Sequence, residues 1–253
     1  MKNICCKIQI LLFSILHFVA FSQIDGSKSL SNKDTSQQSV NIETSPNNLK
    51  NPVLKNIGFL LFNNFETLDV FGPAEIFGRL KDIYKIEFYS LEGGVISSSQ
   101  NVKIVTEKLS ENEKFDIFLI PGGLGTRKEV DNPNLISAIL NNSISANHVL
   151  TVCTGSALLA KTGLLNGLAA TSNKRAFEWA SSQESKVNWV KKARWTSDGK
   201  YYTSSGISAG MDMTLGYIKD KYGVELARKI AYEIEYTWQE NKDLDPFYLQ
   251  NKK

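Results

Sequence analysis

Residues 149–160 read Val-Leu-Thr-Val-Cys-Thr-Gly-Ser-Ala-Leu-Leu-Ala, and this stretch decides the fold. It begins as a short apolar run rich in β-branched residues, which is typical of a buried strand. It then crosses a Cys-Thr-Gly-Ser turn and continues as a small-residue, helix-favouring segment. A cysteine between such a strand and helix is typical of a nucleophile elbow, which lifts the sulfur above the carboxyl edge of the sheet. The stretch therefore predicts that Cys153 is a reactive residue.

The expected reactivity of Cys153 depends on that turn. The N-terminus of the following helix carries a partial positive charge, which favours the thiolate over the thiol. The alternative is a structural cysteine, because a free cysteine packs as a small hydrophobe. A structural cysteine has no need of a Thr-Gly-Ser turn beside it, so the pattern favours the functional interpretation.

The N-terminal stretch has the features of a secretory signal peptide. Lys2 and Lys7 form a basic start, and residues 8–21 are mostly apolar. Ala20 and Ser22 are the small residues that signal peptidase recognises. The apolar run is shorter than the roughly 18 to 20 residues that a transmembrane helix needs. We therefore predict cleavage after residue 22 and export to the periplasm or the outside of the cell.

The rest of the chain divides into a polar leader and one folded domain. Residues 23–52 are rich in Ser, Asn, Gln, Asp and Lys, and they are too polar to bury the surface that would offset their ordering entropy. We predict a disordered leader there. Residues 53–253 have a length of about 200 residues, which suits a single α/β domain with a full core.

Charge and cysteine content limit the classes of partner. Without Lys2 and Lys7 the formal net charge falls from +3 to +1, and no basic block remains. We therefore expect a small-molecule substrate, and neither nucleic acid nor an anionic membrane as a partner. Cys5 and Cys6 lie in the predicted signal peptide, so Cys153 has no partner for an internal disulfide. An unpaired thiol in an exported protein indicates a reactive group.

Strand and helix patterns alternate along the folded part. Strands are predicted over 53–62, 84–91, 95–97, 102–106, 115–120 and 149–152 with a hairpin over 195–204, and helices over 67–80, 133–145, 174–182, 209–222 and 224–235. This order predicts a three-layer α/β sandwich of the flavodoxin-like type, with a mostly parallel sheet covered by helices on both faces.

Ligands bind beyond the carboxyl ends of the strands in such sheets. Three segments that could take part in chemistry lie at these ends, namely 63–69, 121–126 and 153–156. The glycines of residues 122–125 lack the GxGxxG spacing of a nucleotide loop. We therefore expect a site that uses side chains from these segments and neither a cofactor nor a metal.

With these segments placed, the chain resembles the DJ-1/PfpI superfamily, which has a class I glutamine amidotransferase-like fold. The likeness is strongest to isonitrile hydratases and to the ligand-binding half of AraC-type regulators. The motifs that carry it are Gly58–Phe62 (GFLLF), Leu68–Pro73 (LDVFGP), Glu75–Phe77 (EIF), Ile120–Gly123 (IPGG), Val152–Ser156 (VCTGS), Gly163–Gly167 (GLLNG), Thr203–Asp212 (TSSGISAGMD) and Glu235–Tyr236 (EY). Together they are specific for the family and much less so for one reaction.

The resemblance implies a role for each matching residue. Cys153 corresponds to the family nucleophile, and Thr154 follows it as in isonitrile hydratases. Asp69 corresponds to the acidic residue that faces the nucleophile. Gly122 and Gly123 correspond to the loop that offers backbone N–H groups to the reacting oxygen or nitrogen. The resemblance also implies a homodimer.

One position departs from the family pattern. Relatives commonly read Ala-Thr-Thr-His-Trp where this chain has Ala170-Thr171-Ser172-Asn173-Lys174, so their histidine is replaced by Asn173. We expect Asn173 near the pocket or its dimer-facing rim, where it offers hydrogen bonds but no proton transfer at neutral pH. His148 starts the elbow strand and, at about 3.3 Å per residue, lies well over 10 Å from Cys153 along the chain. A Cys-His dyad is therefore not available.

The remaining acidic residues have competing interpretations. An ionised Asp69 beside the thiol would raise the pKa of Cys153, so it helps only if the two groups share a proton or if Asp69 acts as acid and then base. The alternative for Asp69 is a helix N-cap. Glu66 is expected to be a solvated charge at the rim. Asp212 suits the first turn of a helix, where its charge complements the dipole.

Three functions are compatible with these residues. The first is an isonitrile hydratase-like lyase, which adds water to an isocyano group and gives an N-substituted formamide. The second is a non-catalytic ligand-binding module, and the third is a thiol-based redox or protective protein that acts through oxidation of Cys153. Retention of Cys153 and Asp69 favours the first or third function, whereas loss of the histidine favours the second.

Overall fold

The computed structural model describes residues 53–110 and 113–248, so the predicted signal peptide and polar leader lie outside the described residues. Within this part of the chain, an eight-stranded sheet has the order β3-β4-β2-β1-β5-β6-β10-β9. Its strands are β1 (Lys55–Leu60), β2 (Tyr84–Ser90), β3 (Gly94–Ser97), β4 (Lys103–Lys108), β5 (Ile117–Ile120), β6 (His148–Thr151), β9 (Trp195–Asp198) and β10 (Tyr201–Ser204). The six inner strands pair in parallel, and β3 and β9 pair antiparallel at the two edges.

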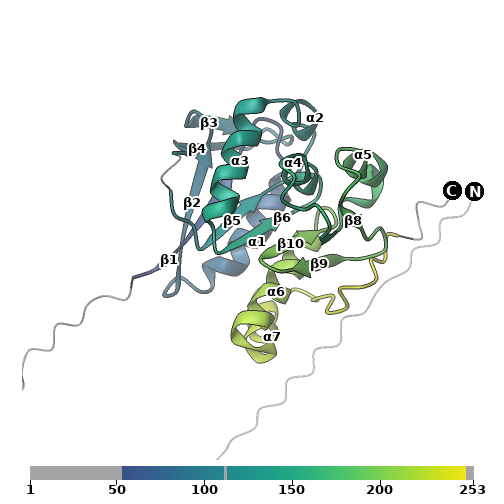
Figure 1. The fold of residues 1–253 in the computed structure, drawn as a ribbon. Coiled ribbons are helices and arrows are strands. Elements are labelled where there is room, and N and C mark those ends of the chain that lie inside the picture. The colour runs from purple at the N-terminus through teal and green to yellow at the C-terminus, as the bar shows by residue number, and fades with distance from the viewer. Residues whose placement is uncertain (1–52, 111–112, 249–253) are drawn as a thin grey trace, which may run out of the picture. The chain divides into compact units, whose positions relative to one another are not determined.

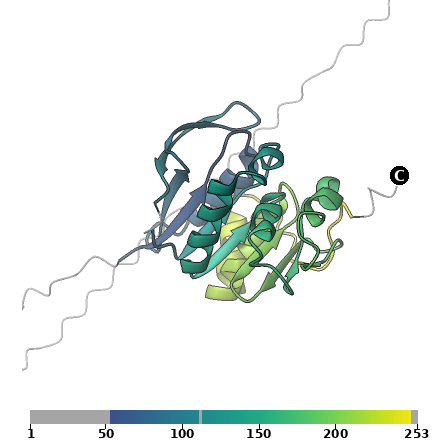
Figure 2. The same ribbon diagram turned by 45° about the horizontal axis from the view of Figure 1, so that its top comes forward.

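Helices cover both faces of this sheet (Figure 1). One layer holds α1 (Thr67–Gly78), α6 (Ala209–Tyr222) and α7 (Val224–Glu233), and the other holds α2 (Thr126–Glu129), α3 (Pro133–Ser145), α4 (Gly155–Lys161) and α5 (Phe177–Ser181). Figure 2 shows the two layers of helices from a second direction. The predicted three-layer α/β sandwich with a mostly parallel sheet is therefore confirmed.

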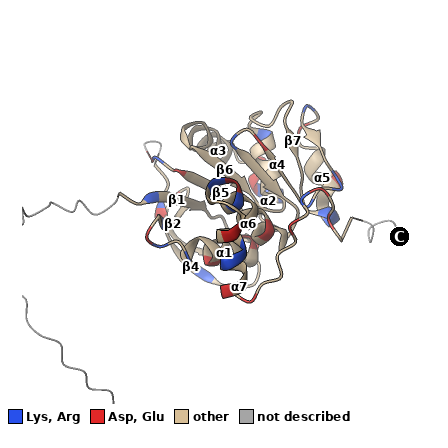
Figure 3. Cartoon of the chain, turned by 90° about the horizontal axis from the view of Figure 1, so that it is seen from below, with Lys and Arg blue, Asp and Glu red and all other residues tan. Residues whose placement is uncertain are grey.

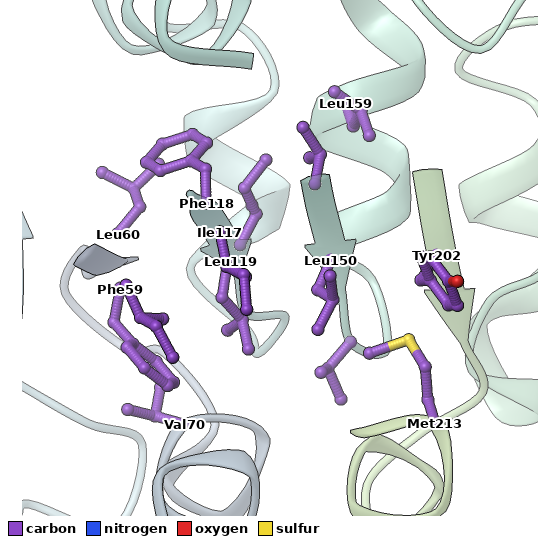
Figure 4. Packing of buried hydrophobic residues seen from close by; sticks show 14 of the residues in the cluster. Phe59, Leu60, Val70, Ile117, Phe118, Leu119, Leu150, Leu159, Tyr202 and Met213 are labelled. Atoms are coloured by element: carbon purple, nitrogen blue, oxygen red, sulfur yellow. The ribbon is translucent and has the colours of Figure 1, made fainter. Parts of the chain in front are cut away.

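The core lies on both sides of the central strands. All four residues of β5 are buried, as expected for a strand with a helix layer on each face. Figure 4 shows Val70 of α1 and Met213 of α6 on one side of the strands and Leu159 of α4 on the other. Phe59 and Phe118, on neighbouring strands, have no exposed surface. Burial of each such side chain contributes about 1.5–3 kcal/mol.

The first strand leads directly to the functional edge of the sheet. β1 ends at Leu60, two residues earlier than the pattern predicted, and the chain then turns at Asn64, whose φ of 62° lies in the left-handed region that asparagine tolerates. Helix α1 begins three residues later. Pro73 lies inside this helix and not near its beginning, and without an N–H group it leaves the carbonyl of Asp69 without its helical hydrogen bond.

Three features of the described residues were not predicted. They are the short helix α2, the two-stranded sheet of β7 (Ala169–Ala170) and β8 (Asn188–Trp189), and a segment after α7 that returns along β9. All three are too short or too irregular to produce a helix or strand period. Two of them, α2 and the returning segment, contribute residues to the surroundings of Cys153.

Charges of both signs are interspersed over the elements seen in Figure 3. Exposed pairs such as Arg228–Glu240 and Lys229–Glu233 join opposite charges on and beside α7. This pattern agrees with the small formal net charge of the chain. In the described residues, no helix combines the length and the apolar character needed to cross a membrane.

Candidate active site

Cys153 lies at the turn between β6 and α4, as the sequence predicted. Its φ is 58°, a left-handed conformation that side-chain-bearing residues rarely adopt. The backbone is held on both sides: the N–H of Cys153 donates to the carbonyl of Ser205 at 3.1 Å, and its carbonyl accepts the hydroxyls of Ser156 and Ser172 at 3.0 Å each. These three contacts stabilise the strained elbow, which fixes the position of the sulfur.

Asp69 reaches the same place from the first turn of α1. Its side chain is fully buried, and Oδ2 accepts a hydrogen bond from the backbone N–H of Gly122 at 2.9 Å. The carboxyl lies close enough to Cys153 for the two groups to shift each other's pKa, while Oδ1 has no hydrogen-bond partner among the described residues. Glu66, not Asp69, is the N-cap residue of α1. The capping interpretation of Asp69 is therefore wrong.

Burial controls the protonation of this pair. It raises the pKa of Asp69 well above the ordinary range, although the Gly122 N–H opposes the shift. It also raises the pKa of Cys153, and the Asp69 charge raises it further. The amide N–H of Thr154 and the side chain of Asn173 lower the Cys153 pKa but do not outweigh burial. The helix N-terminus thus acts on the Cys153 pKa in the predicted direction, but burial outweighs it and opposes the ionisation of both groups at once.

The backbone N–H groups of the glycine loop already have protein partners. Gly122 donates to Asp69, and Gly123 donates to the hydroxyl of Thr154 at 3.2 Å. The prediction that these groups point at a substrate therefore needs correction. Their role in the structure is to position Asp69 and Thr154. The N–H of Thr154 is directed at the Cys153 sulfur instead.

Gly122 also brings the loop close to the elbow. A Cβ at this position would lie 2.5 Å from the Thr154 nitrogen and 2.8 Å from the Cys153 Cβ. Only glycine permits this approach, because backbone atoms cannot move aside as a flexible side chain can. The loop that carries Gly122 is therefore packed directly against the elbow, and the Gly122 N–H donates to Asp69 from there.

Asn173 lies beside the thiol. Its Oδ1 accepts the backbone N–H groups of Arg175 and Ala176 at 2.9 and 3.2 Å, which caps a 3₁₀ turn. The amide NH₂ therefore faces the other way, and its interaction with Cys153 lowers the pKa of the thiol. Gly206 packs against both groups, since a Cβ there would lie 1.9 Å from Asn173 Nδ2 and 3.0 Å from the Cys153 Sγ.

The other titratable residues singled out in the sequence lie away from the thiol. His148, at the start of β6, packs edge-on against Tyr217 at 5.2 Å, and burial together with neighbouring lysines lowers its pKa. Glu66 accepts hydrogen bonds from Gln100 on the exposed rim. Asp212 is buried and forms an ion pair with Arg194, the residue before β9, at 2.7 Å. No cluster of His, Cys, Asp or Glu in the described residues could hold a metal ion.

Sequence reasoning missed Arg127. Its guanidinium stacks 3.3 Å from the ring centroid of Trp179 and donates to Thr126 Oγ1 at 3.1 Å. Thr126 in turn donates to Thr154 at 3.0 Å, and the positive charge of Arg127 interacts favourably with a thiolate at Cys153. Its position just after the glycine loop, at the carboxyl edge of the sheet, could have indicated that Arg127 lies near the site.

A pocket of about 330 Å³ opens beside the thiol. Asn173 and Gly206, which contact Cys153, form part of its wall. The pocket is otherwise lined by the apolar side chains of Leu68, Ile207 and Phe247 and by Lys174, Arg175, Ser205 and Ser208. A largely apolar pocket with a few convergent polar groups is the usual form of a small-molecule site.

Comparisons with known proteins identify relatives of this chain. A model of the DJ-1/PfpI family matches residues 55–220. The chain is 29% identical over 184 residues to an isonitrile hydratase of Pseudomonas putida, and the match covers 72% of this chain and 78% of that relative. It is also 29% identical over 189 residues to the HTH-type transcriptional regulator GbdR of Pseudomonas aeruginosa. That match covers 72% of this chain but only 50% of the regulator.

Solved structures give the same result for the fold. A THiJ/PfpI family protein from Pseudomonas syringae superposes with a TM-score of 0.65 at 23% identity, covering 81% of this chain and 82% of that chain. DJ-1beta of Drosophila melanogaster superposes with a TM-score of 0.64 at 21% identity, covering 74% of this chain and 100% of that chain. At these identities the likeness concerns the fold alone.

Proposed function

This chain belongs to the DJ-1/PfpI family, and from that premise we propose that it is a cysteine-dependent enzyme of the isonitrile hydratase type. One observation carries the proposal: the Cys153 thiol and the Asp69 carboxyl share a buried site beside a largely apolar pocket. The 29% identity to an isonitrile hydratase supports the same reaction class.

In the proposed reaction, Cys153 reacts as the thiolate while Asp69 holds the proton of the pair, and the sulfur adds to the isocyano carbon of R–N≡C. The carbon–sulfur bond forms while the Asp69 carboxylic acid delivers its proton to the same carbon, which gives a thioimidate. Asp69, now a carboxylate, takes a proton from water, and the oxygen attacks the thioimidate carbon. Asp69 passes that proton to the nitrogen of the tetrahedral intermediate. The thiolate then leaves while the hydroxyl proton returns to Asp69, which releases R–NH–CHO and restores the starting pair. A positioned acid and base of this kind contributes about 10²- to 10⁴-fold in rate.

The raised pKa of Asp69 suits both halves of this cycle. A carboxyl with an ordinary pKa of about 4 would be ionised at neutral pH and could not donate the first proton. Burial keeps the Asp69 proton available, and the Gly122 N–H stabilises the carboxylate that remains after transfer. Thr154 N–H and the Asn173 amide stabilise the sulfur as an anion, both before attack and when it leaves.

The test is a turnover assay of the full chain with a panel of isonitriles, in which the formamide is detected by mass spectrometry. We expect formamide production by the natural protein and none above background by Cys153→Ala. His148→Ala is the matched control, because His148 lies at the opposite end of β6, and it should retain activity. Equal turnover by the natural protein and Cys153→Ala would contradict the proposal.

A ligand-binding module is the second candidate. The Asn173 amide cannot act as a base, the Gly122 and Gly123 N–H groups are already engaged, and a regulator is among the relatives. This candidate predicts saturable binding of a small molecule, seen by calorimetry, that survives in Cys153→Ala without turnover. A redox role through oxidation of Cys153 is the third candidate, and DJ-1beta of Drosophila melanogaster is among the structural neighbours.

We also propose that the protein is exported and forms a homodimer. Export rests on the basic start, apolar run and small residues of the N-terminal stretch. N-terminal sequencing of secreted or periplasmic protein should begin at residue 23, and material that begins at Met1 would contradict cleavage. Light scattering at micromolar concentration should give the mass of two chains.

A further inference from the structure

The segment after α7 returns to the active-site edge of the sheet. Residues 236–248, here named the C-terminal strap, run beside β9 and form the yellow segment of Figure 1. The carbonyl of Lys242 accepts the backbone N–H of Arg194 at 2.7 Å. Farther along, the N–H of Asp245 donates to the carbonyl of Lys192, also at 2.7 Å. These backbone contacts hold the strap along the edge of the domain.

A buried ion pair fixes the end of the strap. The guanidinium of Arg194 bonds to Asp212 of α6 at 2.7 Å and contacts Asp245 of the strap at 3.5 Å, and all three side chains are buried. Asp245 uses its other carboxylate oxygen to accept the backbone N–H of Phe247 at 2.8 Å. The Phe247 ring also lies 6.0 Å from the Arg194 guanidinium. The anchor therefore determines where Phe247 lies.

Phe247 completes an apolar wall around the pocket beside Cys153. It is 48% exposed, and the two other apolar residues that line the pocket, Leu68 and Ile207, are 40% and 39% exposed. The three side chains come from the start of α1, the loop before α6 and the strap. Exposed apolar side chains from separate segments that gather around one pocket mark a surface that an apolar ligand covers.

The cations of the pocket differ in what they offer a ligand. Lys174 is buried, and its ammonium donates to Thr171 Oγ1 and to the carbonyls of Ser172 and Ala193 at 2.6 to 3.3 Å. All three of its donor hydrogens are therefore used inside the protein. Arg175 is exposed at the rim, so it is the lining residue that a carboxylate on a ligand would reach.

We propose that Phe247, positioned by the C-terminal strap, is the residue that determines which substituents reach Cys153. It selects isonitriles whose nitrogen carries a bulky apolar group, and that group packs against Phe247, Ile207 and Leu68. This inference rests on the proposed function for its substrate but not for its geometry. Its test therefore includes a readout that needs no turnover of isonitriles.

The first experiment compares Phe247→Ala and Phe247→Leu with the natural protein on benzyl isonitrile and methyl isonitrile. We expect KM for the benzyl compound to rise about tenfold in Phe247→Ala, equivalent to about 1.4 kcal/mol, with an intermediate rise in Phe247→Leu. The kcat for both compounds and the KM for methyl isonitrile should change less than about twofold. Leu244→Ala is the matched control, because Leu244 is an exposed apolar residue of the same strap that does not line the pocket, and it should leave both substrates unaffected.

The second experiment measures the alkylation rate of Cys153 by N-benzylmaleimide and by iodoacetamide. The ratio of the benzylmaleimide rate to the iodoacetamide rate should fall several-fold in Phe247→Ala and stay constant in Leu244→Ala. An unchanged ratio, or an equal loss for both reagents, would overturn the inference. If the natural protein hydrates no isonitrile but the ratio still falls, the proposed function fails and the role of Phe247 stands. A larger effect of Arg175→Gln than of Phe247→Ala would assign selection to the cation and contradict the inference.

Discussion

The Asp69 carboxyl and the Cys153 thiol interact in a site where both are buried. Burial raises the pKa of each group, and the charge of Asp69 raises that of Cys153 further. Ionisation of both groups at once is therefore strongly disfavoured. The protonation of the pair therefore depends on the Asp69 charge and on the groups packed around the thiol.

The first prediction concerns the titration of the thiol. Asp69→Asn removes the negative charge that raises the Cys153 pKa, and asparagine can still accept the Gly122 N–H. The pH midpoint of Cys153 alkylation by iodoacetamide should therefore move to lower pH in the variant. The hydration rate should nevertheless fall steeply, because the proton donor is lost. A midpoint that moves to higher pH would contradict the Coulombic cause.

The second prediction concerns stability. The folded pKa of Asp69 is raised above its unfolded value of about 3.9. Its contribution to stability is therefore full below that pH and is lost as the pH rises through the folded pKa. Asp69→Asn should increase the free energy of unfolding in urea at pH 7 more than at pH 4. A stabilisation of the same size at both pH values would contradict the burial of an ionisable carboxyl.

The third prediction concerns Asn173. Asn173→Asp keeps an oxygen that can cap the 3₁₀ turn, but it replaces the amide donor beside the sulfur with a carboxylate. The Cys153 pKa should rise, and alkylation at pH 7.5 should slow about tenfold for each unit of the rise. Asn173→Ala provides the comparison, since it should lose about 0.5–2 kcal/mol of stability through the missing cap. Faster alkylation in Asn173→Asp would show that the amide does not face the thiol.

The fourth prediction concerns Gly206. The Cβ of Gly206→Ala would overlap the Asn173 amide and touch the Cys153 sulfur, so Asn173 must leave its position. Activity should fall at least tenfold, which corresponds to about 1.4 kcal/mol in the barrier. Gly78→Ala on α1 is the matched control, because no atom lies within 4 Å of its Cβ position, and it should keep full activity. Equal activities of the two variants would contradict the packing described around the thiol.

The sequence predicted the elements that have a clear period. The apolar runs of β1, β5 and β6 and the amphipathic pattern of α3 lie within a few residues of their predicted bounds. Local chemistry also located the elbow, since a strand, a Cys-Thr-Gly-Ser turn and a helix leave few places for Cys153. The fold class follows from the order of these elements.

The contacts between loops could not be predicted in the same way. The N–H groups of Gly122 and Gly123 are donated to Asp69 and Thr154, and this pairing depends on how three loops meet in space. The Cys153 pKa depends on burial more than on the following helix, and burial was not visible in the turn itself. The strap that carries Phe247 has no periodicity, because backbone contacts and one buried ion pair hold it in place.

The most direct test of the central claim is intact-protein mass spectrometry of the full chain, mixed with an isonitrile and quenched in acid within the first turnover. If Cys153 attacks the isocyano carbon, the protein should be heavier by the mass of one isonitrile, and peptide mapping should locate this mass on Cys153. The same experiment with Cys153→Ala should give no added mass and no formamide. Formamide production at the natural rate by Cys153→Ala would contradict nucleophilic attack by Cys153.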